Sequence, residues 1–302
     1  MPRKVEIVGL HPSIKLVLLD IDGTLLDGSS IELENVRWQL SRLQRYNVRF
    51  SVATGRTIAG SRDVLHALDA RNRIRWIISY NGGVIAKSDA SPWIERNVIC
   101  AAAYSALIDQ CRIANLQPLV YTCQNSFDVQ SAEKVFTEES MYEGKSKEFN
   151  NMRIIRVPRL SDIPKEDIVA VLVSDPLKNG TIVDYATNLR KVMGSTLRVT
   201  TSGGACVEIG HPNSTKLISM KRLCEMEKIS TSEVMAIGDN FNDLEMLSAC
   251  GLGCAVSNSP QEVKQVCHFV SQYRAAGGVV DALRMLLNSL RADRRKKKFA
   301  KD

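Results

Sequence analysis

Short apolar runs alternate with segments of helical periodicity in the first quarter of the chain. The runs at 16–19, 48–52 and 74–79 have the length of buried strands, and each ends at polar or turn-forming residues. Between them, apolar residues recur at helical spacing over 33–43 and 58–68. This strand–helix–strand–helix–strand order predicts a parallel, doubly wound sheet.

The pattern then changes to a mixed one before the first type returns. The middle part is predicted to contain a helix at 101–114, a strand at 118–122, a strand at 168–173, a helix at 182–193 and a strand at 197–201. The first pattern resumes with predicted strands at 233–237 and 252–256 and predicted helices at 214–227 and 278–290. We therefore predict an α/β protein: a discontinuous core, 1–86 and 201–290, with an α+β unit inserted at 87–200.

The first predicted strand ends at two acids that are one residue apart, Asp20 and Asp22. In open α/β sheets, ligands bind at the carboxyl ends of the strands. Alternate residues that leave a strand point to the same side, so the two carboxylates are expected to converge there. Their mutual repulsion would be relieved by a divalent cation. The alternative is an ordinary strand-ending turn, since Asp and Gly are common turn residues.

Four segments along the chain resemble, in order, the four motifs of the haloacid dehalogenase superfamily of phosphohydrolases. They are Asp20 to Leu26, Val52 to Arg56, Lys216, and Ile237 to Asp243. Tyr80 to Gly83 and Gly203 to Ile209 further resemble the Cof-type branch. The chain departs from the family in having Leu217 where the family has a glycine after the lysine. The resemblance implies a Rossmann-like core with a cap that selects the substrate.

The acids are assigned roles in phosphate-ester hydrolysis. Asp20 is the candidate nucleophile, because a carboxylate can form an aspartyl-phosphate, and Asp22 is the candidate general acid and base. Asp20 and Asp239 are candidate side-chain ligands of Mg²⁺, and the resemblance implies that Asp22 binds the metal through its backbone carbonyl. Asp243 is the fourth metal-site candidate, with the alternative that it is only an acid at a helix N-terminus.

A second set of residues is predicted to bind the phosphate or the rest of the substrate. Lys216 would balance negative charge in catalysis, although a lone helical lysine is usually exposed. The predicted binding residues are Thr54, Gly55, Arg56, Asn81, Gly82, Gly83 and Asn242. Arg56 fits substrate contact and support of the sheet edge equally well, and Asn242 fits a helix N-cap as well as phosphate contact. Asn258 is a further candidate for the phosphate pocket.

Charge and composition restrict the class of protein. The net charge is +7 over 302 residues, but the last twelve residues carry +5 of it, so the rest of the chain is nearly neutral. We expect 291–302 to be a disordered basic tail, and without interleaved aromatic residues a nucleic-acid module is not expected. The eight cysteines form no Cys-x-x-Cys pair and the four histidines form no ligand set, so reduced thiols and no zinc site are predicted.

The sequence thus predicts a Mg²⁺-dependent phosphatase of small phosphorylated metabolites. It contains no apolar stretch of membrane-spanning length and no signal-peptide pattern near its start, so a cytoplasmic location and no membrane partner are expected. Two alternatives stay open: a sugar phosphomutase with the same two acids, and a binding protein that uses its basic tail to hold RNA or another partner. The physiological substrate and the oligomeric state are not readable.

Overall fold

The computed structural model describes residues 14–27, 32–68, 74–88, 95–124, 132–138, 153–174, 181–202 and 206–299. The chain divides into two compact units, which are considered one at a time. The first unit comprises 1–54, 63–76 and 219–302, and the second comprises 55–62 and 77–218. The core-and-cap boundaries expected from the sequence stay a prediction.

The first unit is built on a parallel sheet. Its strands lie in the order β14-β13-β12-β1-β2-β3. Their bounds are β1 Leu16–Leu19, β2 Arg49–Ala53, β3 Ile74–Ser79, β12 Val234–Gly238, β13 Leu252–Ala255 and β14 Phe269–Val270. The helices that begin or end in this unit are α1 Glu32–Gln44, α2 Ile58–Leu68, α6 Lys216–Glu227, α7 Leu244–Ala249, α8 Gln261–Val266 and α9 Ala275–Phe299.

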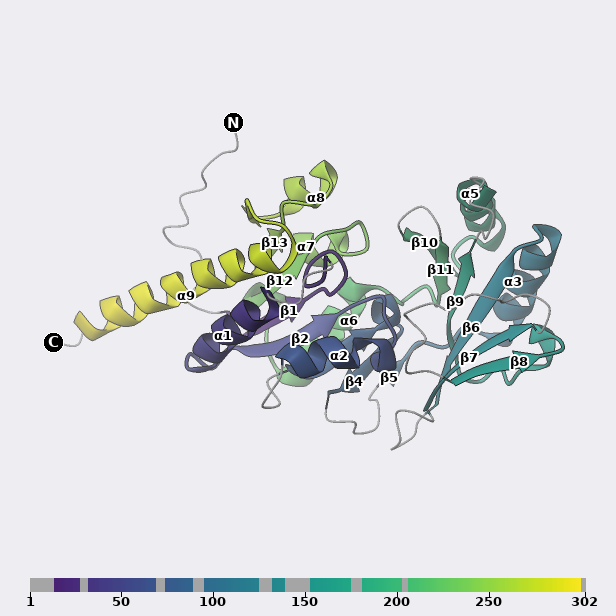
Figure 1. Ribbon diagram of the computed structural model, residues 1–302, viewed down its shortest axis with the longest axis horizontal. Coiled ribbons are helices and arrows are strands. Elements are labelled where there is room, and N and C mark those ends of the chain that lie inside the picture. Colours follow the sequence, from purple (N-terminus) through teal and green to yellow (C-terminus); the bar gives the residue numbers. More distant parts are fainter. Residues whose placement is uncertain are drawn as a thin grey trace. The chain divides into compact units, whose positions relative to one another are not determined.

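Strand β1 is central and entirely apolar. All four of its residues are buried, as expected for a parallel strand with helices on both faces. Helices α1 and α9 pack side by side in this unit (Figure 1), and α7 and α8 lie against β13. The strand register aligns the carboxyl ends of β1, β2 and β12 along one edge of the sheet, because Leu19 pairs with both Val52 and Ile237.

The second unit contains a six-stranded sheet in the order β10-β11-β9-β6-β7-β8. Its strands are β6 Gln117–Cys123, β7 Glu133–Glu138, β8 Arg153–Val157, β9 Ile168–Ser174, β10 Arg198–Ser202 and β11 Cys206–Gly210. Helices α3, Ala101–Ile113, and α5, Thr181–Met193, cover it and share one apolar core with it. The unit also contains the short antiparallel pair β4, Val84–Lys87, and β5, Glu95–Arg96.

The predicted α/β class is confirmed, and the predicted strands and helices differ from the observed ones mainly at their ends. Strands β7 and β8 lie in a stretch that carries no strand in the sequence prediction. The expected disorder of 291–302 is wrong as far as Phe299, because α9 continues to that residue. Lys and Arg are good helix formers, and no Gly or Pro interrupts the segment. Residues 300–302 lie outside the described residues.

The eight cysteines are free thiols in the structure, and most of them are buried. Burial raises the pKa of Cys254 well above the ordinary value and that of Cys250 to about 11. Cys100 is exposed at the N-cap of α3. Among the described residues, no helix combines the length and the apolar character that crossing a membrane requires.

Candidate active site

Three carboxylates meet at the edge of the first unit's sheet. Asp20 directly follows β1 and Asp239 directly follows β12, and the chain turns to bring Asp243 back to them. Oxygen atoms of the three side chains all lie within 4.8 Å of one another. Asp20 is 4% and Asp243 0% exposed, so three negative charges are held close together with little access to water.

The turn that follows β1 is closed by its own backbone. Leu25 and Leu26 both donate to the carbonyl of Ile21, and Gly23 donates to Leu26 O at 2.8 Å. Gly23 has φ +79°, and a Cβ at this position would collide with the carboxylate of Asp239. Glycine is therefore required here both by the backbone conformation and by the closeness of the acid.

Thr24, in the same turn, holds one of the acids. Its buried hydroxyl donates to Asp239 Oδ1 at 2.9 Å. In the same turn, the carbonyl of Gly23 accepts from Asn258 Nδ2 at 2.8 Å, while Asn258 Oδ1 accepts from the N–H of Ala275. Asn258 thus links the turn to the first residue of α9, and its predicted place in a phosphate pocket stays a prediction.

Asp243 organises the loop that follows β12. Its Oδ2 accepts from the backbone N–H groups of Asp239 at 3.1 Å and Asn240 at 3.2 Å. The side chain fits only because residue 238 is glycine, since a Cβ there would lie 2.6 Å from Asp243 Cγ. Asp243 is also the N-cap residue of α7, so the N-cap alternative for Asn242 is wrong.

The second unit gathers most of the other predicted site residues. Gly55 lies against the Asn81 side chain, because a Cβ on Gly55 would be 3.1 Å from Asn81 Nδ2. Gly82, at φ +103°, lies against the backbone of Thr215, where a Cβ would come within 2.6 Å of the carbonyl carbon. Lys216 follows Thr215, begins α6 and is only 1% exposed, so the usual exposure of a helical lysine does not apply here.

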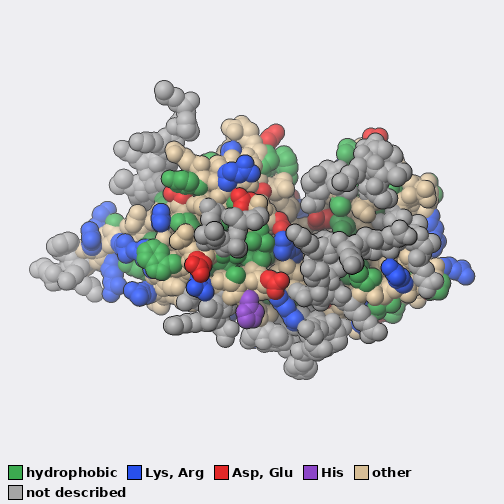
Figure 2. Space-filling model, viewed as in Figure 1, with side chains coloured by type: hydrophobic (Ala, Val, Ile, Leu, Met, Phe, Trp, Pro, Cys, Tyr) green, Lys and Arg blue, Asp and Glu red, His purple; other side chains and the backbone are tan. Residues whose placement is uncertain are grey.

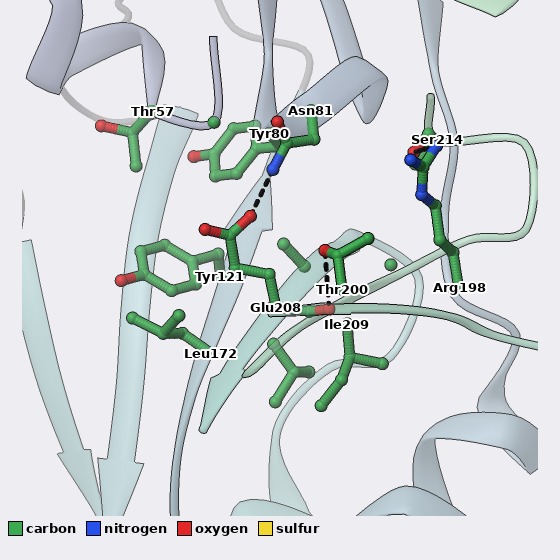
Figure 3. Close-up of a pocket in the computed structure, with 14 residues that line it drawn as sticks. Thr57, Tyr80, Asn81, Tyr121, Leu172, Arg198, Thr200, Glu208, Ile209 and Ser214 are labelled. Atoms are coloured by element: carbon green, nitrogen blue, oxygen red, sulfur yellow. Dashed lines mark hydrogen bonds between the residues drawn. The ribbon is translucent and has the colours of Figure 1, made fainter. Parts of the chain in front are cut away.

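The segment after β3 has an unusual backbone. Tyr80 and Asn81 both have φ of +52° and Gly82 has φ +103°, which places three successive residues in the left-handed region. A non-glycine residue in this region costs about 1–2 kcal/mol. Strain of this kind persists only where surrounding contacts impose it, and it commonly marks a functional segment. The conformation turns the Asn81 amide toward the carboxylate of Glu208, to which it donates (Figure 3).

A cavity opens beside this segment, and all the residues that line it belong to the second unit. It contains about 540 Å³ of empty space, part of it open to solvent. Its charged side chains are Arg198 and Glu208, its apolar surface includes Leu172 and Ile209, and the ring of Tyr121 forms part of its wall (Figure 3). Tyr80 packs edge-on against Tyr121 with ring centroids 5.9 Å apart.

The structure thus places the predicted site residues in two groups. The first unit brings Asp20, Asp239 and Asp243 together, with Asn242 in the same loop and Thr54 directly after β2. The side chain of Asp22 is exposed and lies outside the three-carboxylate cluster, and the metal ligation implied for its backbone carbonyl stays a prediction. The second unit contains Gly55, Arg56, Asn81, Gly82, Gly83 and Lys216.

Sequence reasoning missed Thr24, Arg198, Glu208 and Tyr121 as functional candidates. Thr24 had a signal, because it lies in the same short turn as the two acids. Glu208 lies in the segment Gly203 to Ile209 that carried the resemblance, whereas Arg198 and Tyr121 are isolated residues, and only the tertiary fold brings the three to one cavity. Residues 203–205, at the start of one segment that carried the resemblance, lie outside the described part of the chain.

Comparison with known proteins gives a consistent result. The family model for haloacid dehalogenase-like hydrolases matches residues 17–283. The chain is 26% identical to the 5-amino-6-(5-phospho-D-ribitylamino)uracil phosphatase YwtE of Bacillus subtilis, with 91% of this chain and 99% of that protein covered. It is 27% identical to the phosphoglycolate phosphatase of Methanopyrus kandleri, over 92% and 99% of the two chains.

A solved structure has the same fold. The haloacid dehalogenase-like hydrolase from Bacteroides thetaiotaomicron superimposes with a TM-score of 0.75 at 26% identity, and the match covers 90% of this chain and 99% of that one. The similarity therefore extends over both units.

Proposed function

The chain belongs to the haloacid dehalogenase-like hydrolase family, and we propose that it is a Mg²⁺-dependent phosphatase of small phosphorylated metabolites. The observation that carries the proposal is the cluster of Asp20, Asp239 and Asp243 at the ends of β1 and β12. The two named relatives are phosphatases of different phosphate esters, so family membership supports phosphate-ester hydrolysis without indicating which ester is the substrate.

The cluster suits a magnesium ion. Mg²⁺ prefers oxygen ligands and uses few carboxylates, and among the described residues the candidate metal group consists of carboxylates alone. Asp20 and Asp239 would hold the ion, and Asp243 would keep the loop in place through its bonds to two backbone N–H groups. When bound, the ion would neutralise charge on the phosphoryl oxygens and on the acids around them.

The protein's own groups then divide the reaction between them. A carboxylate oxygen of Asp20 attacks phosphorus in line with the ester oxygen, and Asp22 donates a proton to the departing alkoxide. Asp22 next removes a proton from a water molecule, which attacks the aspartyl-phosphate and releases inorganic phosphate. Exposure of the Asp22 side chain is compatible with this exchange of protons with substrate and water.

Other predicted site residues would bind the phosphate in this proposal. Lys216 would balance the negative charge of the phosphoryl group, and Thr54 would offer its hydroxyl to the phosphate. Within the second unit, the cavity lined by Arg198, Glu208 and Tyr121 is the candidate pocket for a small organic molecule. Its mixture of charged, hydroxyl and aromatic groups suits a polar metabolite better than a purely apolar one.

The test is phosphate release from a panel of sugar phosphates, nucleotides and cofactor phosphates that includes the esters of the two named relatives. The wild-type protein is assayed with Mg²⁺ and with EDTA, beside Asp20→Asn and the matched control Asp184→Asn, which changes an exposed acid of α5. We expect metal-dependent release that is lost in Asp20→Asn and kept in Asp184→Asn. If folded wild-type protein releases no phosphate from any compound, the proposal is wrong.

A further inference from the structure

One buried carboxylate of the second unit has no part in the reaction described above. Glu133, the first residue of β7, is 1% exposed. Burial raises the pKa of its carboxyl, although hydrogen bonds from Tyr80, Ala59 and Ile58 and the charge of Arg62 act in the opposite direction. A buried carboxyl group is costly unless its oxygens are paired, so its partners indicate its role.

Both oxygens of Glu133 accept hydrogen bonds from two segments, the start of α2 and Tyr80, which lie next to predicted binding residues in the chain. Oε1 accepts from the backbone N–H of Ile58 at 2.8 Å and from the hydroxyl of Tyr80 at 2.6 Å. Oε2 accepts from the backbone N–H of Ala59 at 2.7 Å. These two N–H groups open α2, whose own first turn contains no acid, so the oxygens of Glu133 supply the acceptors that the first N–H groups of a helix lack.

The two segments are also joined to each other. Tyr80 donates its backbone N–H to the carbonyl of Arg56 at 3.1 Å, and Thr57 completes the helix cap by accepting from Gly60 N at 2.8 Å. Glu133 therefore fixes the start of α2 and, through the Tyr80 ring, the strained segment that presents Asn81 to the cavity.

We infer that Glu133 is a positioning residue for substrate binding, an inference that rests on the proposed function. It ties the six-stranded sheet to the start of α2 and to Tyr80, so that the neighbouring Arg56 and Asn81 keep the geometry that the phosphate ester requires. Small displacements of such groups cost up to about 100-fold in rate, because catalysis depends on near-attack geometry.

The main variant is Glu133→Gln, which keeps the shape of the side chain. If its amide oxygen stays with Ile58 and Tyr80, its NH₂ group faces the N–H of Ala59, and two donors then oppose each other. Tyr80→Phe removes one of the three donors and leaves the carboxylate paired with the helix. The matched control is Glu138→Gln, at the other end of β7, whose carboxylate also accepts a backbone N–H, that of Leu160 at 3.0 Å.

The readouts separate positioning from loss of stability. We expect Glu133→Gln to lower kcat/KM about 10- to 100-fold, while Glu138→Gln stays within about twofold at a similar Tm. Hydrogen exchange in peptides that cover 55–62 and 77–86 should speed up in Glu133→Gln and stay unchanged in the control. The effects of Glu133→Gln and Tyr80→Phe on kcat/KM should not add in the double variant, because the two side chains share one interaction.

Two results would overturn the inference. One is Glu133→Gln with wild-type kcat/KM and wild-type exchange in both peptides. The other is a loss of activity that follows Tm equally in Glu133→Gln and Glu138→Gln. If the wild-type protein hydrolyses nothing, the proposed function fails separately, and the inference is decided by the exchange data and by the Kd for inorganic phosphate, which must weaken in Glu133→Gln for it to stand.

Discussion

Replacing Thr24 by Val tests how the acid cluster is held. The change keeps the shape of the side chain and removes the hydroxyl that donates to Asp239 Oδ1 at 2.9 Å. Thr24 is 0% exposed, so no solvent molecule takes the place of the lost donor. A hydrogen bond to a charged group contributes about 1.5–3 kcal/mol, and loss of a group that orients a metal ligand typically weakens metal binding about 10- to 100-fold.

We therefore expect Thr24→Val to raise the Mg²⁺ concentration needed for half-maximal phosphatase activity about 10- to 100-fold, which corresponds to about 1.4–2.7 kcal/mol. Activity at saturating Mg²⁺ should fall much less. Thr24→Ser, which keeps the hydroxyl, is the control and should stay near the wild type. The assay is a Mg²⁺ titration of all three proteins, with calorimetric Mg²⁺ binding as a second measurement. A Thr24→Val protein with wild-type half-saturation would refute the view that this hydroxyl orients Asp239.

Two further predictions concern stability. Gly82→Ala should lower the free energy of unfolding by more than Gly194→Ala does. Both residues have positive φ, but only Gly82 lies against backbone atoms, those of Thr215. Equal urea midpoints for the two variants would contradict this. Since burial raises the pKa of Glu133 above its ordinary 4.5, its contribution to stability is fully present below pH 4.5 and declines as the pH rises through the raised pKa. Urea unfolding from pH 4.5 upward should show this decline in the wild type, and a Glu133→Gln protein with the same decline would assign it to another group.

The sequence was sufficient for the parallel sheet and for the positions of the acids. Apolar runs that end in Asp mark where strands end, and parallel strands end along one edge, so Asp20 and Asp239 meet for reasons that are local to each strand. Asp243 follows Asp239 by only four residues, so its return to the cluster depends on a short turn with a glycine at 238. A turn this short can be predicted from the types of the residues that form it.

The surroundings of the site were not predictable in the same way. Glu133 is 75 residues from Ile58, and its bond depends on the first residues of α2 lying at the start of β7 rather than on any local pattern. Strand β7 itself, Glu133–Glu138, contains three charged residues, and its buried acid breaks the usual alternation of apolar and polar positions. Arg198 and Glu208 likewise reach the cavity only through the pairing of β10 with β11.

The burial of the thiols has a practical consequence for spectroscopy. The thiolate is the form that reacts with maleimides and oxidants, and burial raises the pKa of Cys111, Cys224 and Cys250 to about 11. Cys206 and Cys267 are half-buried, whereas Cys100 is exposed directly before α3. A fluorescent or spin label applied briefly at neutral pH should therefore attach first at Cys100, so the protein can report on the motion of its six-stranded unit without any cysteine being replaced.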